Sequence, residues 1–369
     1  MQAGLNPAIS GVVGGLALTE SLLGSVINRP SSPFVASLAT DDGKPCGVGT
    51  WARGTGGKAN ASGTTTSDLG NFSNTFNVTY RGLQAGLDHA CFGGHYGGWD
   101  LSFGATLGTN TGSSTQPVLS YEPGLTGVLE PGSAISINRT KFQQLYGGAY
   151  VTASRGRLFG DLQMRASRTE FDLTNIALPN GSALGVKDQR YTSNGQTLSG
   201  SLGYAFTLNE SAGLSLVPTL GFSFSSTKVG SLVFDKNGDT TNDGILDIDR
   251  VKSRIGFASV SLVRSRVLPD NRSGITMFGT ATLYNDFAKG TKASYFDLDT
   301  NGVPTTTGLE SVSNNLGSYG EFSLGLNYTR LLTPGQARAR QLDTSVRLDG
   351  RKGKNIESWG LTAQLRLQF

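Results

Sequence analysis

The chain has 369 residues, of which 37% are hydrophobic and 52 are glycine, a smaller apolar share than a soluble domain of this length uses to fill its core. Its 18 Phe and 11 Tyr recur at regular intervals, which a disordered chain does not show. The net charge of +4 is scattered, without a basic run interleaved with aromatic residues, so we expect no nucleic-acid partner. A transmembrane barrel fits this composition, because half of each strand faces lipid and the other half faces a wet lumen.

The first predicted element is a helix near the start of the chain. Asn6 can cap its first turn, and Pro7 suits the first helical position. The run over 8–27 is mostly apolar and carries a single charge, Glu20. Pro30 ends the element, because proline cannot continue a helix.

Small residues make this helix a poor partner for lipid. Gly11 and Gly15 form a G-x-x-x-G pair, which lets a helix lie close against another surface, as a plug or a dimer partner does. No basic stretch precedes the apolar run, so no secretory signal peptide is visible. Because a barrel of this kind must be exported, we expect the sequence to be a mature fragment of an exported protein.

From Cys46 onward the hydrophobic period changes to two, which is typical of strands with two unlike faces. The last predicted strand shows the pattern most clearly, with an apolar face formed by Trp359, Leu361, Ala363, Leu365, Leu367 and Phe369. The same pattern predicts twelve strands, at 46–59, 75–91, 97–108, 141–154, 157–172, 192–207, 213–226, 249–266, 274–288, 316–331, 337–349 and 356–369.

The connections between these strands alternate in length. They are short after the second, fourth, sixth, eighth and tenth strands, and long and polar after the first, third, fifth, seventh and ninth. This is the arrangement of periplasmic turns and external loops in outer-membrane barrels, which a soluble all-β fold has no reason to keep. We therefore predict an all-β fold in which 46–369 form a twelve-stranded antiparallel transmembrane β-barrel, preceded by a helix and linker over 1–45.

The two cysteines lie at matching ends of the first predicted hairpin. Cys46 opens the first strand and Cys91 closes the second, so a symmetric antiparallel hairpin brings them face to face. Both belong to the periplasmic end, which is oxidising, and we predict a disulfide there. A register slip of the hairpin would separate the pair.

Candidate chemistry is sparse. The sequence lacks a G-x-S-x-G motif, and its two histidines, His89 and His95, fall near a periplasmic turn without the spacing of a metal or triad site. The acidic stretch 235–249 offers oxygens for a cation such as Ca²⁺, but its spacing is not that of an EF-hand, and a solvated loop is the favoured interpretation. We expect no catalytic residue, no cofactor and no metal.

Several charged residues alternate toward the lumen in this register: Asp161, Arg165, Glu321 and Arg347. In a wet lumen they would solvate the wall, pair with the helix or tune an ion channel, and their pattern does not separate these roles.

Seven short motifs follow one another along the strands. They are Trp51-Ala52-Arg53-Gly54, Tyr80–Asp88, Trp99-Asp100, Tyr146–Tyr150, Gly200–Tyr204, Arg254-Ile255-Gly256 and Leu365–Phe369. Each motif is weak alone. In this order, and with a leading helix, twelve strands and a terminal aromatic residue, the chain resembles the autotransporter (type V secretion) β-domain over nearly its whole length.

The resemblance implies roles for both ends of the chain. The helix over 6–28, from Asn6 to Asn28, would lie in the lumen and join the barrel to an upstream passenger. Phe369 and its alternating neighbours would form the signal that the barrel-assembly machinery reads: Trp359, Leu361, Leu365 and Leu367. Some family members cut themselves at an Asn-Asn pair within the helix. Asn28 is single and lies at the helix end, so we expect no cleavage of that type.

The expected function is therefore that of an integral outer-membrane translocator, not an enzyme, that anchors and helps export a covalently linked N-terminal passenger. Its expected partners are outer-membrane lipid, lipopolysaccharide and the assembly machinery, and we expect a monomer. A diffusion porin and an adhesin are the alternatives, followed by a barrel hydrolase. A porin has no reason to carry a capped apolar helix, and a hydrolase needs a histidine near the external rim.

Overall fold

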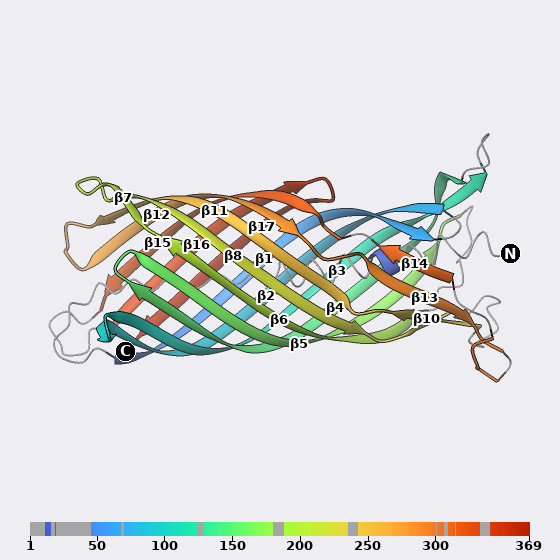
Figure 1. Cartoon of the computed structure of the whole chain (residues 1–369), viewed down its shortest axis with the longest axis horizontal. Coiled ribbons are helices and arrows are strands. Elements are labelled where there is room, and N and C mark those ends of the chain that lie inside the picture. The colour runs from blue at the N-terminus through green and yellow to red at the C-terminus, as the bar shows by residue number, and fades with distance from the viewer. Residues whose placement is uncertain are drawn as a thin grey trace.

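Alternating side chains fold the chain into one continuous antiparallel sheet that closes on itself (Figure 1). The computed structural model describes residues 12–15, 19, 46–67, 70–123, 129–179, 188–234, 243–299, 301–305, 309–313, 315–332 and 340–369. Within these residues the sheet has 17 strands: β1 (Cys46–Ser67), β2 (Gly70–Tyr96), β3 (Trp99–Pro123), β4 (Leu129–Arg155), β5 (Leu158–Ala177), β6 (Gln189–Tyr204), β7 (Phe206–Asn209), β8 (Leu214–Val229), β9 (Leu232–Phe234), β10 (Gly244–Ile248), β11 (Val251–Val267), β12 (Ser273–Asp286), β13 (Thr291–Asp297), β14 (Leu309–Ser313), β15 (Ser318–Leu331), β16 (Gln341–Gly353) and β17 (Ile356–Gln368).

Twelve long strands form the barrel ring, as the sequence predicts. They follow the order β1-β2-β3-β4-β5-β6-β8-β11-β12-β15-β16-β17, and each pairs with the next one antiparallel. The ring closes where β17 pairs with β1, from Gly49 opposite Gln368 to Ala61 opposite Ile356. We call this junction the seam. The rim that carries Phe369 is the C-terminal rim, and the opposite one is the distal rim.

Near the C-terminal rim the sheet is apolar outside and polar inside. On β2, Leu83 and Leu87 face outward with 68% and 62% of their surface exposed, whereas Gln84 and Asp88 face inward and are buried. The same outward exposure recurs around the ring, including Phe103, Leu107, Leu145, Met164, Leu220, Leu283, Phe322 and Leu348. A continuous apolar belt of this kind is stable only against lipid. Among the described residues, no helix is long and apolar enough to cross a membrane.

The first four strands are longer than predicted, and two expected loops are strands instead. β1 and β2 continue to Ser67 and Gly70, and β3 and β4 continue to Pro123 and Leu129. The reason is an exchange of the two faces beyond the apolar belt. There the inward residues of β2 are mostly apolar, namely Phe72, Phe76 and Val78, with the buried Asn74 among them. The outward residues between them are polar: Ser73, Thr75, Asn77 and Thr79.

The connections after the seventh and ninth predicted strands also contain strands. β9 pairs with β10, β10 with β13, and β13 with β14. β14 then pairs with the distal end of β1, where Thr65 lies opposite Ser313. These short strands extend the wall at the distal rim. Most of the acidic stretch considered for Ca²⁺ lies outside the described residues; Asp247 lies in β10 and accepts a hydrogen bond from the Ser231 hydroxyl.

The N-terminal helix is described only at residues 12–15 and 19, which are helical and lie within the barrel. Val12 and Val13 are buried among inward residues of the distal half, including Phe76 and Phe171. Several residues assigned to the helix from the sequence lie outside the described residues: Asn6, Pro7, Gly11, Glu20 and Asn28.

Candidate functional site

The distal half of the lumen is filled by an apolar cluster that includes the helix. Val13 is fully buried there, and Phe171, Leu232 and Leu246 contribute side chains from three different strands. Gly15 packs closely on β3, because a Cβ at this position would lie only 2.6 Å from the Gln116 Oε1 atom. The helix therefore touches the wall through small and apolar residues, so the distal lumen is packed rather than open.

Amide and hydroxyl side chains line the lumen nearer its middle. The Asn110 amide donates to Gln144 Oε1 at 2.8 Å, and the Gln144 amide donates to Thr169 Oγ1 at 3.1 Å. The Gln84 amide donates to Thr106 Oγ1 at 2.8 Å. These bonds join β2 to β3 and β3 through β4 to β5. This part of the wall is therefore polar, as the lumen side of an outer-membrane barrel is.

The inward charges predicted from the sequence do face the lumen. Arg165 is buried, donates to Gln163 Oε1 at 3.0 Å and lies over the Tyr146 ring at 5.5 Å. Asp161 accepts a hydrogen bond from the Ser201 hydroxyl. Within the described part of the chain, the ion pairs do not include a carboxylate partner for Arg165.

A buried ion pair crosses the seam near the C-terminal rim. Arg366 on β17 holds Asp88 on β2 through two bonds, Nη1 to Oδ2 at 2.7 Å and Nη2 to Oδ1 at 2.6 Å. The Tyr150 hydroxyl donates to Asp88 Oδ2 at 2.8 Å, and Trp51 Nε1 donates to that hydroxyl at 2.8 Å. Both charged side chains are almost fully buried. Two-pronged pairs of this kind are among the strongest side-chain contacts.

Gly49 makes this crossing possible. It lies on β1, between the strands that carry Asp88 and Arg366. A Cβ at Gly49 would come within 2.7 Å of both Arg366 Nη2 and Asp88 Oδ1. The ion pair therefore passes directly over the backbone of β1 and ties together the two strands on either side of it.

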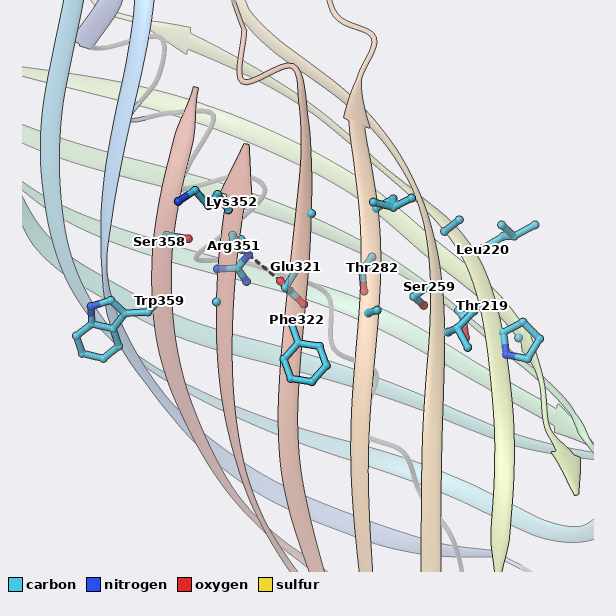
Figure 2. Close-up of a pocket in the computed structure, with 18 of the residues that line it drawn as sticks. Thr219, Leu220, Ser259, Thr282, Glu321, Phe322, Arg351, Lys352, Ser358 and Trp359 are labelled. Carbon is cyan, nitrogen blue, oxygen red and sulfur yellow. Dashed lines mark ion pairs between the residues drawn. The ribbon is translucent and has the colours of Figure 1, made fainter. Parts of the chain in front are cut away.

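A second charged cluster lies farther along the lumen, on β15 and β16. Glu321 receives Arg347 Nη2 and Arg351 Nε, each at 2.7 Å, and Arg351 Nη1 lies 3.0 Å from Asp349 Oδ2. Figure 2 shows Glu321 and Arg351 joined on neighbouring strands, while Phe322, the next residue, points away from the pair. These two consecutive residues therefore show the alternation along a strand between side chains that face the lumen and side chains that face the lipid.

Tyr80 on β2 connects this cluster to the other side of the seam. Its side chain is hydrogen-bonded to that of Arg351. A Cβ at Gly57 on β1 would lie 2.7 Å from the Tyr80 hydroxyl, and one at Gly360 on β17 would lie 3.1 Å from it. The tyrosine thus reaches over both seam strands to β16. The seam is bridged twice from within, each time over a glycine.

The two cysteines lie beside the seam at the C-terminal rim. Cys46 is opposite Cys91 in the β1–β2 register, and the structure joins them in a disulfide. Beside them, the amide of Phe369 donates to the Val48 carbonyl at 2.9 Å, which attaches the last residue to β1. The start of the barrel is therefore held covalently on one side and by the chain end on the other.

The residues assigned to the assembly signal lie on the outer face of β17 and at its end. Trp359, Leu361, Leu365 and Phe369 each expose between 44% and 51% of their surface, and Leu367 is half-buried. They form an apolar strip that follows β17 beside the seam and is accessible from the lipid side.

The described histidine, His89, lies apart from the lumen charges. His89 is exposed on the outer face of β2, away from the lumen charges. Among the described residues, the one group of possible metal ligands is Cys46, His89 and Cys91. Both sulfur atoms of that group are already joined to one another, so they offer no thiolate to a metal.

Sequence patterns indicated that several charges face inward, but they did not reveal the seam contacts. Asp88 and Arg366 lie 278 residues apart, and only the closure of the ring brings them together. The available signal was weak: each is a charged residue at an inward position of a strand that borders β1.

Comparisons with known proteins give a consistent picture. A family model described as the autotransporter beta-domain matches residues 50–330. The chain is similar to the transport unit of the autotransporter AIDA-I from Escherichia coli, with 12% identity, a TM-score of 0.58, and coverage of 97% of this chain and 98% of that one. It is also similar to the β-domain of the Bordetella autotransporter BrkA, with 18% identity, a TM-score of 0.55, and coverage of 88% and 100%. A comparison with curated proteins finds no match.

Proposed function

Because this chain belongs to the autotransporter β-domain family, we propose that its lumen helix is the end of an exported chain that passes through the barrel from the C-terminal rim. The barrel itself is an integral outer-membrane translocator. The finer assignment is that the passenger precedes the barrel, with 1–45 as helix and linker and 46–369 as the barrel.

One observation carries this proposal: the helix is buried in the distal half of the lumen, while the first strand begins at the C-terminal rim. Val13 packs in the distal apolar cluster, and Cys46 lies beside Phe369 at the other end. The described part of the helix and the start of β1 therefore lie toward opposite rims, which supports a chain threaded through the barrel. Anything attached before the helix is directed toward the distal rim, which we assign to the cell exterior.

We also infer that the chain is not itself an enzyme. In support, the lumen carboxylates of Glu321 and Asp88 are held by Arg351 and Arg366, and His89 lies on the outer face. A hydrolytic site would need a base and a nucleophile within hydrogen-bonding reach of each other, facing water.

The barrel-assembly machinery and lipopolysaccharide complete the proposed partners, with the barrel as a monomer. The exposed strip that ends at Phe369 supports recognition of the last strand during assembly. The ring closes within one chain, which supports a barrel that needs no second copy.

A display assay tests the proposed function. A signal peptide and an epitope tag are placed before Met1, and the protein is expressed in Gram-negative cells. We expect external protease to remove the tag from intact cells while the barrel stays protected. A correctly inserted barrel whose tag is cut only after lysis would contradict the proposal and favour a porin or adhesin.

A further inference from the structure

The outer face of the barrel marks the distal edge of the membrane. Along β2 the outward residue changes from Leu83 to Arg81, and along β17 it changes from Trp359 to Glu357. From Trp359 to the last residue is about ten residues, which at ~3.3 Å each and a tilt of roughly 40° spans about 25 Å. That matches the height of an outer-membrane belt, so the change of character lies at the headgroups of the distal leaflet.

Basic residues dominate at this level of the outer face. Each is exposed, and each is the first charged outward residue beyond the apolar belt on its strand: Lys58, Arg81, Arg168, Arg254 and Lys352. Two exposed acidic residues accompany them: Glu357, and Glu170, which pairs with Arg168 at 3.9 Å. The predominance of cations favours an anionic layer at this height.

A shallow furrow runs through the belt beneath two of these lysines. Its lining includes Leu283, Phe322 and Trp359 together with Lys58 and Lys352. Figure 2 shows Phe322, Trp359 and Lys352 along it.

Small residues form the floor of this furrow. Gly350 lies between Phe322 and Trp359, and Gly320 lies between Leu283 and Lys352. A Cβ at Gly350 would meet no atom within 4 Å, and one at Gly320 would meet none closer than 3.9 Å. Neither glycine is required by a close contact within the chain, so the space above them is open to the surroundings.

We propose that this furrow binds one phosphorylated glycolipid of the outer leaflet, with a phosphate held by Lys58 and Lys352 and an acyl chain lying over Gly350 and Gly320. The inference rests on the outer-membrane placement of the proposed function. Lysine ammonium groups donate charge-assisted hydrogen bonds to phosphate oxygens. Glu357 lies opposite Lys352 on β17, the strand between those that carry the two lysines, and Arg81 on β2 adds a further positive charge.

Lipid retention by the full chain tests the site. The protein is extracted in detergent, purified bisphosphorylated lipid A is added, and bound lipid is measured by native mass spectrometry. We expect one lipid to be retained preferentially, and the Lys58→Ala/Lys352→Ala double variant to weaken retention by roughly tenfold to thirtyfold, since each surface cation contributes about 1 kcal/mol toward an anionic lipid. The matched control is Lys228→Ala/Lys252→Ala, which removes the same charge from exposed positions on β8 and β11 and should change retention by less than about twofold.

A second pair of variants tests the furrow without touching charge. Gly350→Leu should fill the groove and weaken retention, while the open space at that position leaves folding intact, as judged by the heat-dependent shift of the barrel in gel electrophoresis. Gly54→Leu is the control, because its added Cβ meets only Leu83, at 3.7 Å.

Three results would each overturn the site: unchanged retention in the lysine double variant, equal loss in its control, or equal retention of dephosphorylated lipid A or a glycerophospholipid. Passenger display is scored separately in the same variants. Loss of lipid retention with normal display would leave the translocator function unaffected. Failed display with the lipid still bound would contradict the translocator function and not the lipid site.

Discussion

At the residue scale, the Asp88–Arg366 pair shows how glycine positions contribute to closing a barrel. The pair spans β1 only because Gly49 carries no side chain, and Tyr80 crosses the seam over Gly57 and Gly360 in the same way. The backbone hydrogen bonds of the β1–β17 ladder fix the distance between β1 and β17. The bridges add contacts from β2 to β16 and β17, so that opening the seam would also break buried polar contacts.

Replacing Asp88 with asparagine should destabilise the barrel. The change leaves the Arg366 guanidinium buried without its carboxylate, and breaking a buried pair in this way costs about 3 kcal/mol. The measurement is the temperature at which the folded barrel converts to the unfolded band in gel electrophoresis. Gly49→Ala should act in the same direction, because its Cβ would displace both partners.

The matched control for this prediction is Glu170→Gln. Glu170 pairs with Arg168 at 3.9 Å, but both side chains are largely exposed, so its removal should cost less than about 1 kcal/mol. Equal shifts for the buried and exposed pairs would mean that the seam bridge contributes nothing special to closure.

At the element scale, the strand pattern predicts the membrane-spanning segments well and their distal ends poorly. The alternation along β17, from Trp359 to Phe369, locates that strand and its lipid-facing side from sequence alone. On β2 the strand predicted from this alternation begins only at Thr75. Beyond the membrane the apolar residues of β2 lie on the opposite face and pack inward around the helix. A pattern that assumes one buried face throughout cannot follow this exchange.

Short turns at the C-terminal rim behave as their sequences suggest. In the connection between β11 and β12, Asp270 accepts hydrogen bonds from the Ser273 hydroxyl at 2.8 Å and from the Arg272 amide at 3.1 Å. These donors, the hydroxyl first, hold the pKa of the Asp270 carboxyl below its ordinary value. Asn271 takes a positive φ of 52° beside it, a conformation that asparagine tolerates.

Removing the disulfide should weaken the first hairpin. Cys46 and Cys91 are separated by 45 residues, and a cross-link over a loop of this length stabilises a fold by about 2–4 kcal/mol. We expect a reducing agent to lower the melting temperature of the wild-type barrel in the gel assay. The Cys46→Ser/Cys91→Ser variant should start lower and show no further response. An unchanged wild-type midpoint under reduction would contradict this role.

At the scale of the whole molecule, the two halves of the lumen differ in character. The half toward the C-terminal rim is polar and crossed by charged pairs, whereas the distal half holds the apolar cluster around Val12 and Val13, with a few buried polar side chains such as Asn74 and Gln116 beside it. The twelve-strand ring and its short turns could be predicted from the two-residue hydrophobic period and from the lengths of the connections. The packed distal half could not, because it depends on contacts between the helix and strands more than a hundred residues away, such as Phe171.

The most direct test of the threaded arrangement joins the helix to the wall during display. Val13 and Phe76 belong to the same buried cluster, and the native cysteines are already paired with each other. Val13→Cys and Phe76→Cys are introduced behind a tagged passenger, cross-linked with a short bis-maleimide, and the cells are then treated with external protease. We predict that the cross-linked molecules lose their tag in intact cells, because the helix in the lumen is continuous with an exported passenger. Cross-linked molecules whose tag resists protease until the cells are lysed would show that the chain before the helix faces the periplasm, which contradicts export through this barrel.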